Sequence, residues 1–342
     1  MIYYTLPALF LLTAMTTPLI PVWGAAQDRL PHTETPFRLA FPVACEYGET
    51  CWPMNYTDHD RRDGEIKDAA CHAQSYDGHK GTDIAISNWQ SVLDGVAIIA
   101  PAPGTVLGIR NNQSDQFPSD ADKARIRAQG RECGNGVRLD HGDGWITQFC
   151  HMKKGSVSVD FGDKIETGTP LGHIGMSGIT DHPHMHMSLT KDGEVIDPFT
   201  GRVTSEPCGL EGARSLWADD TPYKDFSLYD AGFSVGRPDF KKVARGQDPT
   251  PPHARSASLV FYMSYFGARQ GDKINLSVSR PDGSVFASQD IDQEKTRARQ
   301  HYFTGKRNTK GRFMTGTWTA KATITRKDTG KTQTLTRTWK AE

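Results

Sequence analysis

Two segments of the chain combine histidine with aspartate at a spacing that suits a metal ion. His79 and Asp83 are four residues apart within residues 76–86, where glycines allow turns and the aspartate begins an apolar run. A His-x-x-x-Asp spacing is expected about once by chance in a chain of this composition. The other instance, His59 and Asp63, lies in a run of charged residues and is interpreted as a solvated surface. Because Zn²⁺ accepts imidazole together with carboxylate, His79 and Asp83 are the candidate metal ligands.

A second pair of histidines alternates with apolar residues in residues 183–189. Successive side chains of a strand face opposite ways, so His184, His186 and Ser188 would share one face. The opposite face would carry Met185, Met187 and Leu189 into the core. The pattern therefore predicts a strand that directs two imidazoles into an open groove.

Two further histidines lie close to these motifs. His151 ends a predicted strand at residues 145–151, and a histidine in that position alone is more often structural than catalytic. His182 has the same parity as His184 but precedes Pro183, so it is assigned to the loop and left outside the metal shell.

The elements that must position these residues are short and β-prone. Long helical periodicity is absent from residues 77–200, and glycine turns separate the apolar runs, which predicts a mostly antiparallel β domain. A polar insertion at residues 111–132 interrupts it, with a short helix expected at residues 121–128. The predicted strands are residues 96–100, 104–109, 136–140, 145–151, 170–175 and 183–190.

The remainder of the chain is also expected to be β-structure. Residues 206–256 are rich in proline and glycine and are interpreted as linker and covering loops. In residues 257–342, short strands and hairpin turns at Asp282-Gly283 and Thr329-Gly330 predict a β-sandwich, with an immunoglobulin-like arrangement as a candidate. The fold class is therefore all-β.

Taken in order, these residues resemble the lysostaphin-type (LytM-like) family of zinc metalloendopeptidases. The resemblance covers residues 77–200, and we place the boundaries of a peptidase domain at residues 77–205. It rests on the ordered segments 78–83, 100–106, 134–137, 141–144, 148–151, 162–164, 172–175 and 183–186. The resemblance implies an antiparallel sheet with an open groove, one Zn²⁺ per chain held by His79, Asp83 and His186, and two catalytic histidines, His151 and His184.

The implied chemistry is hydrolysis of a peptide bond. Three protein ligands leave one position on Zn²⁺ for water, whose pKa the metal lowers. His151 and His184 could take up the proton or stabilise the oxyanion. We expect an exported zinc metalloendopeptidase that acts on cross-links or stems of bacterial peptidoglycan. The alternatives are a non-catalytic cell-wall module that activates an amidase and a secreted protease that acts on glycine-rich proteins.

Charge is distributed unevenly along the 342 residues. Residues 1–225 hold 19 basic and 30 acidic residues, whereas residues 226–342 hold 21 basic and 10 acidic residues. This difference argues against a uniform nucleic-acid binder, and no nucleic-acid partner is expected. The basic end suggests a partner such as an anionic cell-wall polymer, with an intramolecular match to the acidic half as the alternative.

The amino terminus is typical of export. An uncharged apolar stretch is followed by small residues at 24–26, which predicts a signal peptide at residues 1–26 and a periplasmic or secreted protein. An uncleaved membrane anchor is the alternative, and no later segment is apolar enough to cross a membrane. Residues 27–76 follow as a cysteine-containing segment.

The six cysteines are consistent with an oxidising compartment. Cys133 and Cys150 flank a predicted hairpin turn, which favours a disulfide between them. The other four cysteines, Cys45, Cys51, Cys71 and Cys208, allow three connectivities, and a zinc–thiolate site is disfavoured because no Cys-x-x-Cys pair occurs.

Overall fold

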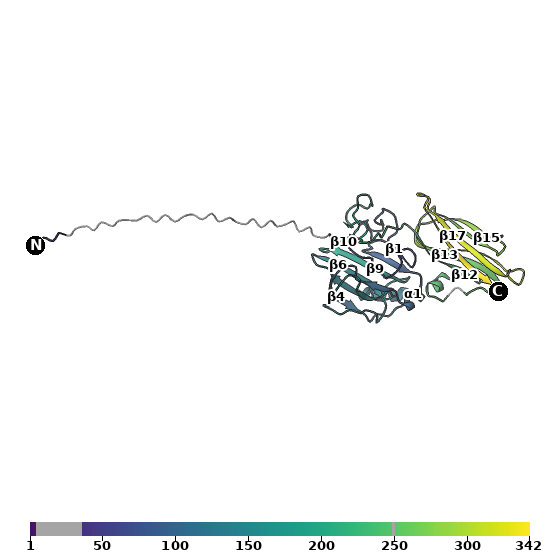
Figure 1. Cartoon of the computed structure of the whole chain (residues 1–342), viewed down its shortest axis with the longest axis horizontal. Coiled ribbons are helices and arrows are strands. Elements are labelled where there is room, and N and C mark those ends of the chain that lie inside the picture. Colours follow the sequence, from purple (N-terminus) through teal and green to yellow (C-terminus); the bar gives the residue numbers. More distant parts are fainter. Residues whose placement is uncertain (5–35, 248–249) are drawn as a thin grey trace, which may run out of the picture. The chain divides into compact units, whose positions relative to one another are not determined.

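A nine-stranded sheet contains the strands that carry the histidine motifs (Figure 1). The structure, a computed structural model, describes residues 1–4, 36–247 and 250–342, of which residues 37–342 form one unit. The main path of the sheet runs β1-β2-β9-β6-β5-β4-β7, and every neighbouring pair in it is antiparallel. These strands are β1 (Cys51–Asn55), β2 (Thr82–Ile86), β9 (His184–Lys191), β6 (Trp145–Met152), β5 (Asn135–Asp140), β4 (Gly104–Arg110) and β7 (Lys164–Ile165).

Smaller elements complete this part of the chain. β10 (Glu194–Asp197) pairs with β9 and with β11 (Arg202–Val203), while β3 (Ala97–Ile99) and β8 (Pro170–His173) form a separate pair. The helices are α1 (Trp89–Asp94), α2 (Asp120–Ala128) and α3 (Phe240–Ala244). The six strands and the short helix predicted here are thus all present, with ends that shift by a few residues.

The core lies on the face of β9 that the alternation predicted. Met185, Met187 and Leu189 are buried in the main hydrophobic cluster, together with Ile84 and Phe149 of the neighbouring strands. Burial of one full-sized apolar side chain contributes about 1.5–3 kcal/mol, so this face determines which way the strand is turned. The histidines of β9 must then face the opposite side of the sheet.

β1 was not predicted. It contributes the edge of the sheet, where Cys51 lies opposite Ile86 and Pro53 lies opposite Ile84. An edge strand tolerates Pro53 because its missing N–H faces away from the ladder. The cysteine-containing segment at residues 27–76 therefore supplies a strand of the same sheet.

The carboxy-terminal residues form two antiparallel sheets on a shared core (Figure 1). The first, second and fifth of their strands form one sheet, and the fourth, third, sixth and seventh form the other. All of these strands except the fourth belong to the same sheets as in an immunoglobulin-type sandwich. The fourth strand pairs with the third instead of with the fifth. The strands are β12 (Ser227–Ser234), β13 (Ser258–Ala268), β14 (Lys273–Ser279), β15 (Val285–Asp292), β16 (Arg297–Arg307), β17 (Gly316–Thr325) and β18 (Thr332–Ala341).

The interpretation of residues 206–256 as linker and covering loops was wrong in part. β12 lies within them and pairs with β13 over its whole length. Glycine and aspartate in β12 masked the strand pattern, and the ladder to β13 stabilises it as a strand. The sandwich therefore begins before residue 257.

All six cysteines form disulfides. The predicted Cys133–Cys150 bridge is confirmed, and the other bridges are Cys45–Cys51 and Cys71–Cys208. The signal peptide expected at residues 1–26 falls almost wholly outside the described residues. Among the helices of the described segments, none has the length and apolar character needed to span a bilayer.

Candidate metal centre

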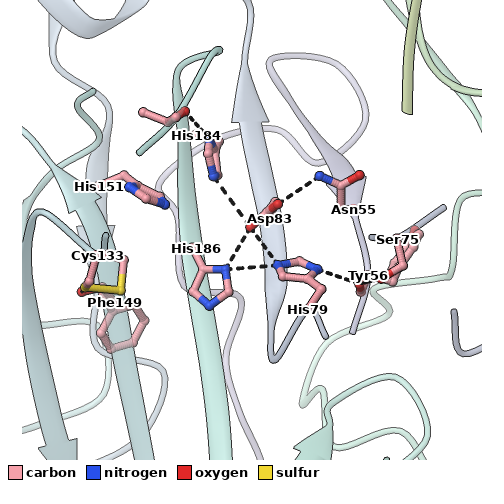
Figure 2. A network of polar contacts seen from close by, with 12 residues as sticks. Asn55, Tyr56, Ser75, His79, Asp83, Cys133, Phe149, His151, His184 and His186 are labelled. Atoms are coloured by element: carbon pink, nitrogen blue, oxygen red, sulfur yellow. Dashed lines mark hydrogen bonds and ion pairs between the residues drawn. A yellow bond between two sulfur atoms is a disulfide. The ribbon is translucent and has the colours of Figure 1, made fainter. Parts of the chain in front are cut away.

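His79, Asp83 and His186 bring one ligand atom each to the same point (Figure 2). Asp83 Oδ1 lies 2.9 Å from His186 Nδ1 and 3.2 Å from His79 Nε2, and the two imidazole nitrogens are 3.1 Å apart. The β2–β9 register causes this convergence, because Asp83 lies directly opposite His186 in the ladder. All three ligand atoms lie within 4.8 Å of one another, and together they could hold a metal ion.

Neighbouring backbone and side chains orient these ligands. Nδ1 of His79 donates to the Tyr56 carbonyl at 2.7 Å, which leaves the lone pair of Nε2 facing Asp83. Asn55 Nδ2 donates to the second carboxylate oxygen of Asp83 at 2.9 Å. Such hydrogen bonds fix the tautomer and direction of metal ligands. Asn55 and Tyr56 were not identified from the sequence, since no spacing connects them with the ligands.

His151 and His184 lie on the side of Asp83 that is opposite Asn55 and Tyr56 (Figure 2). Their ring centroids are 4.6 Å apart, and His184 Nε2 lies 3.5 Å from Asp83 Oδ1. Nδ1 of His151 donates to the Ser177 carbonyl, and Nδ1 of His184 donates to the His182 carbonyl, each at 2.8 Å. Both rings are therefore held with the lone pair on Nε2.

His151 adopts an unusual backbone conformation. Its φ is +61°, in the left-handed region that non-glycine residues seldom adopt. Its N–H donates to the Cys133 carbonyl at 2.8 Å, and the adjacent Cys150 forms the disulfide to Cys133. Such a conformation persists only where the surrounding structure enforces it, and these two constraints do so.

The protonation states suit a site that attracts a cation. Burial alone would raise the pKa of Asp83, but His79, His184 and His186 hold it well below its usual range. Burial lowers the pKa of His186 and, with help from His184 and His186, lowers that of His151 to about 3. Burial would likewise lower the pKa of His79, yet the Asp83 carboxylate raises it. An ionised Asp83 carboxylate beside the neutral imidazole of His186 is the protonation state that a metal-binding donor set requires.

A cleft of about 660 Å³ opens onto these residues. Asp83, His151 and His184 line it, and so do Tyr76 and residues 179–181. The side chain of His186 is 15% exposed, whereas that of His79 is 1% exposed. A substrate can thus approach from the side of His184 and His186.

The structure brings together all five residues selected from the sequence and separates two others. His182 lies in the loop before β9, as expected, where its Nε2 donates to the Ile86 carbonyl at 2.8 Å. The interpretation of His59 as solvated was wrong, because its side chain is fully buried and its Nε2 lies 2.9 Å from Asp197 Oδ2. Asp197 is 138 residues away in sequence, so local pattern could not reveal this pair.

Comparison with known proteins gives a match over the same part of the chain. Residues 77–198 match the sequence model of Peptidase family M23, which confirms the resemblance described above. A curated relative from Haemophilus influenzae, described as an uncharacterized metalloprotease, is 28% identical over 135 residues, 40% of this chain and 23% of its own. The cell division protein DipM of Caulobacter vibrioides is 31% identical over 86 residues, 24% of this chain and 14% of its own.

The matched segment therefore spans less than a quarter of either curated relative. Among solved structures, a zinc-containing peptidase from Vibrio cholerae is 14% identical, with a TM-score of 0.30 and coverage of 47% of this chain and 39% of its own. Csd3 of Helicobacter pylori is 20% identical, with a TM-score of 0.29 and coverage of 47% of this chain and 32% of its own.

Proposed function

Residues 77–198 form a Peptidase family M23 domain, and from this premise we propose that the chain is an exported zinc metalloendopeptidase. We assign His79, Asp83 and His186 as ligands of one Zn²⁺ per chain and His151 and His184 as catalytic residues. The supporting observation is the convergence of three ligand atoms within 4.8 Å beside two imidazoles whose Nε2 lone pairs remain unengaged by the backbone.

The roles of the protein groups follow from their hydrogen bonds. When bound, Zn²⁺ supplies Lewis-acid polarisation of the scissile carbonyl and activation of the attacking water. His184 and His151 can each accept a proton at Nε2, because their Nδ1 atoms donate to carbonyls. Once protonated, either imidazole can donate from Nε2 to the developing oxyanion or to the leaving amine. The carbonyls of His182 and Ser177 hold the rings in place throughout.

We propose cross-links or stems of bacterial peptidoglycan as the substrate and the periplasm or cell exterior as the location. The three disulfides support an oxidising compartment. A relative described as a cell division protein supports a role at the cell wall. The apolar segment near the amino terminus supports export.

The metal assignment is tested by zinc analysis of purified variants. His79→Ala, Asp83→Ala and His186→Ala should each lose stoichiometric zinc, because two remaining ligands hold the ion poorly. His151→Ala and His184→Ala should retain about one zinc per chain and lose roughly 10²–10⁴-fold in turnover. His173→Gln replaces an exposed histidine of the same domain and is the control. It should retain both the zinc content and the turnover of the wild type. Zinc loss in the His151 or His184 variant would reassign that residue as a ligand.

The substrate is tested by digestion of purified peptidoglycan sacculi. Mass spectrometry of the soluble fragments should show new termini within the peptide moieties, and chelation of zinc should abolish them. Products cleaved between glycan and peptide only in the presence of an added amidase would favour the activator alternative. Cleavage of glycine-rich protein but not of sacculi would favour the secreted-protease alternative.

We further propose that the basic sandwich binds an anionic cell-wall polymer. Residues 226–342 carry 21 basic and 10 acidic residues. The full chain should therefore bind sacculi at low salt and dissociate as the ionic strength rises, since the Debye length falls to about 3 Å at 1 M. Absence of salt-sensitive binding would favour the intramolecular match to the acidic half.

A further inference from the structure

The cleft at the candidate metal centre continues into a second cavity. The second cavity has a volume of about 670 Å³, close to the 660 Å³ of the first. The two cavities share four of their lining residues: Lys123, Thr180, Asp181 and Arg299. A chain that extends from the metal centre into the second cavity would therefore run past Lys123 and Arg299.

The walls of the second cavity come from four separate segments, one of which is the loop with Thr180 and Asp181. α2 and the turn before it supply Phe117 and Lys123, α3 supplies Phe240 and its surroundings, and β16 of the sandwich supplies Arg299. The Arg245 guanidinium lies 4.8 Å from the Phe117 ring centroid, and the Phe240 ring stacks on that of His301 at 4.3 Å. Six of the thirteen residues that line the second cavity lie outside the matched residues 77–198, in or next to α3 and in β16.

The extended cleft is basic although the first part of the chain is acidic overall. Besides Asp83, two acidic side chains line the two cavities, Asp120 and Asp181. Five basic side chains line the same two cavities: Lys123, Lys241, Arg245, Arg297 and Arg299. A surplus of positive charge in a confined space attracts an anionic ligand.

Arg299 is partly buried and only weakly paired. Its side chain is only 22% exposed, and its nearest counter-ion, Asp181, lies 3.7 Å away and is itself 77% exposed. Nη1 of Arg299 is buried and has no hydrogen-bond partner among the described residues. A partly buried guanidinium with a distant, solvated counter-ion loses hydration without full compensation, and a carboxylate bound at its exposed part would compensate its charge.

Lys123 lines both cavities with Arg299 and is also weakly paired. Its ammonium is 3.9 Å from the fully exposed Asp120 carboxylate, an ion pair of the kind that contributes little. The capping box between Ser119 and Asp122 fixes the start of α2 and thereby the position of Lys123. Two cations on rigid elements, α2 and β16, thus line both cavities and are each only weakly paired within the protein.

We propose that Arg299, with Lys123, forms a carboxylate-binding subsite of the substrate cleft, so that the preferred substrate is a peptide with a free carboxylate near the scissile bond. This inference rests on the proposed peptidase function, because the subsite is defined relative to its cleft. The planar guanidinium suits bidentate recognition of a carboxylate, and the sandwich thereby takes part in substrate selection.

The test uses four versions of one short peptide that contains a single acidic residue. The peptide carries Glu or its amide Gln, each with a free or an amidated carboxy terminus, so that the two carboxylate sources are separated. Cleavage by the zinc-loaded full chain is measured as kcat/KM, and affinity is measured by calorimetry on the zinc-loaded His151→Ala chain. With Arg299 unchanged, one of the carboxylate forms should be preferred both in cleavage by the full chain and in binding to the His151→Ala chain.

Arg299→Gln should reduce kcat/KM for the preferred peptide by roughly 10–100-fold, as expected for a hydrogen-bonded charge pair. It should change cleavage of the matched amide by less than about 3-fold. Arg299→Lys should give an intermediate loss, because it keeps the charge and removes the bidentate geometry. Lys306→Gln is the matched control, since it removes one charge from an exposed position of the same strand that lines neither cavity.

The outcomes separate this inference from the proposed function. Equal binding of all four peptides, binding of none, or equal losses for the carboxylate and amide forms in Arg299→Gln would overturn the subsite. If Arg299→Gln fails to fold, Lys123→Gln should show the same selective loss, and its absence there would overturn the inference. Selective binding without cleavage of any peptide would uphold the subsite and refute the peptidase function instead.

Discussion

The Cys133–Cys150 disulfide offers a direct test of what holds His151 in its left-handed conformation. Replacement of both cysteines by alanine opens a loop with a sequence separation of 17 residues. The chain-entropy relation gives a loss of about 3 kcal/mol in the free energy of unfolding for a loop of this size. The hydrogen bond from the His151 N–H to the Cys133 carbonyl, at 2.8 Å, would lose its neighbouring covalent support. A displacement of about 1 Å at a reacting group can cost 10²-fold, so we expect a loss of that order in turnover.

The Cys45–Cys51 bridge provides the control, since its sequence separation is 6 residues and neither cysteine lines the cleft. The same relation gives about 2 kcal/mol for Cys45→Ala/Cys51→Ala, with turnover per folded molecule unchanged. Guanidinium unfolding gives the stabilities, and peptide hydrolysis and zinc analysis are carried out where each variant is fully folded. Full turnover in the folded Cys133→Ala/Cys150→Ala chain would refute the role of the disulfide in positioning His151.

Three further predictions concern stability. Burial alone would lower the pKa of His59, but Asp197 raises it, so their pair stabilises the fold below about pH 6.5 and loses this contribution as the pH rises through the folded-state pKa. The difference in unfolding free energy between wild type and His59→Gln should therefore shrink from pH 5.5 to pH 9. A constant difference would contradict this. Arg326→Met leaves the buried Asp272 carboxylate without its cation at 3.3 Å and should cost about 3–5 kcal/mol in denaturant unfolding, with partial recovery on adding Asp272→Asn. Ser119→Ala removes the cap of α2 and should cost about 1 kcal/mol, measured in the same way, whereas an unchanged midpoint would show that the cap contributes nothing.

Much of the main sheet and its local chemistry could be derived from the sequence. The alternation in residues 183–189 is a period-2 pattern, and the structure places Met185 and Met187 in the core. The Cys133–Cys150 bridge followed from its position around a hairpin turn. These features depend on residues close together in the chain, so propensity and spacing are sufficient to indicate them.

Contacts between distant segments were decided only by the tertiary structure. Asp83 lies opposite His186 because of the β2–β9 register, and Tyr56, which contacts His79, directly follows β1, a strand whose proline and cysteine concealed it. His59 is buried against Asp197, and Arg299 of the sandwich lines the cleft at the candidate metal centre. Strand register and the packing of the sandwich beside the cleft arise from the burial of surfaces far apart in sequence. No local periodicity of the sequence indicates which of these surfaces pack together. The sequence by itself thus determined which side chains could do chemistry, whereas the tertiary structure decided which groups orient them and what surrounds them.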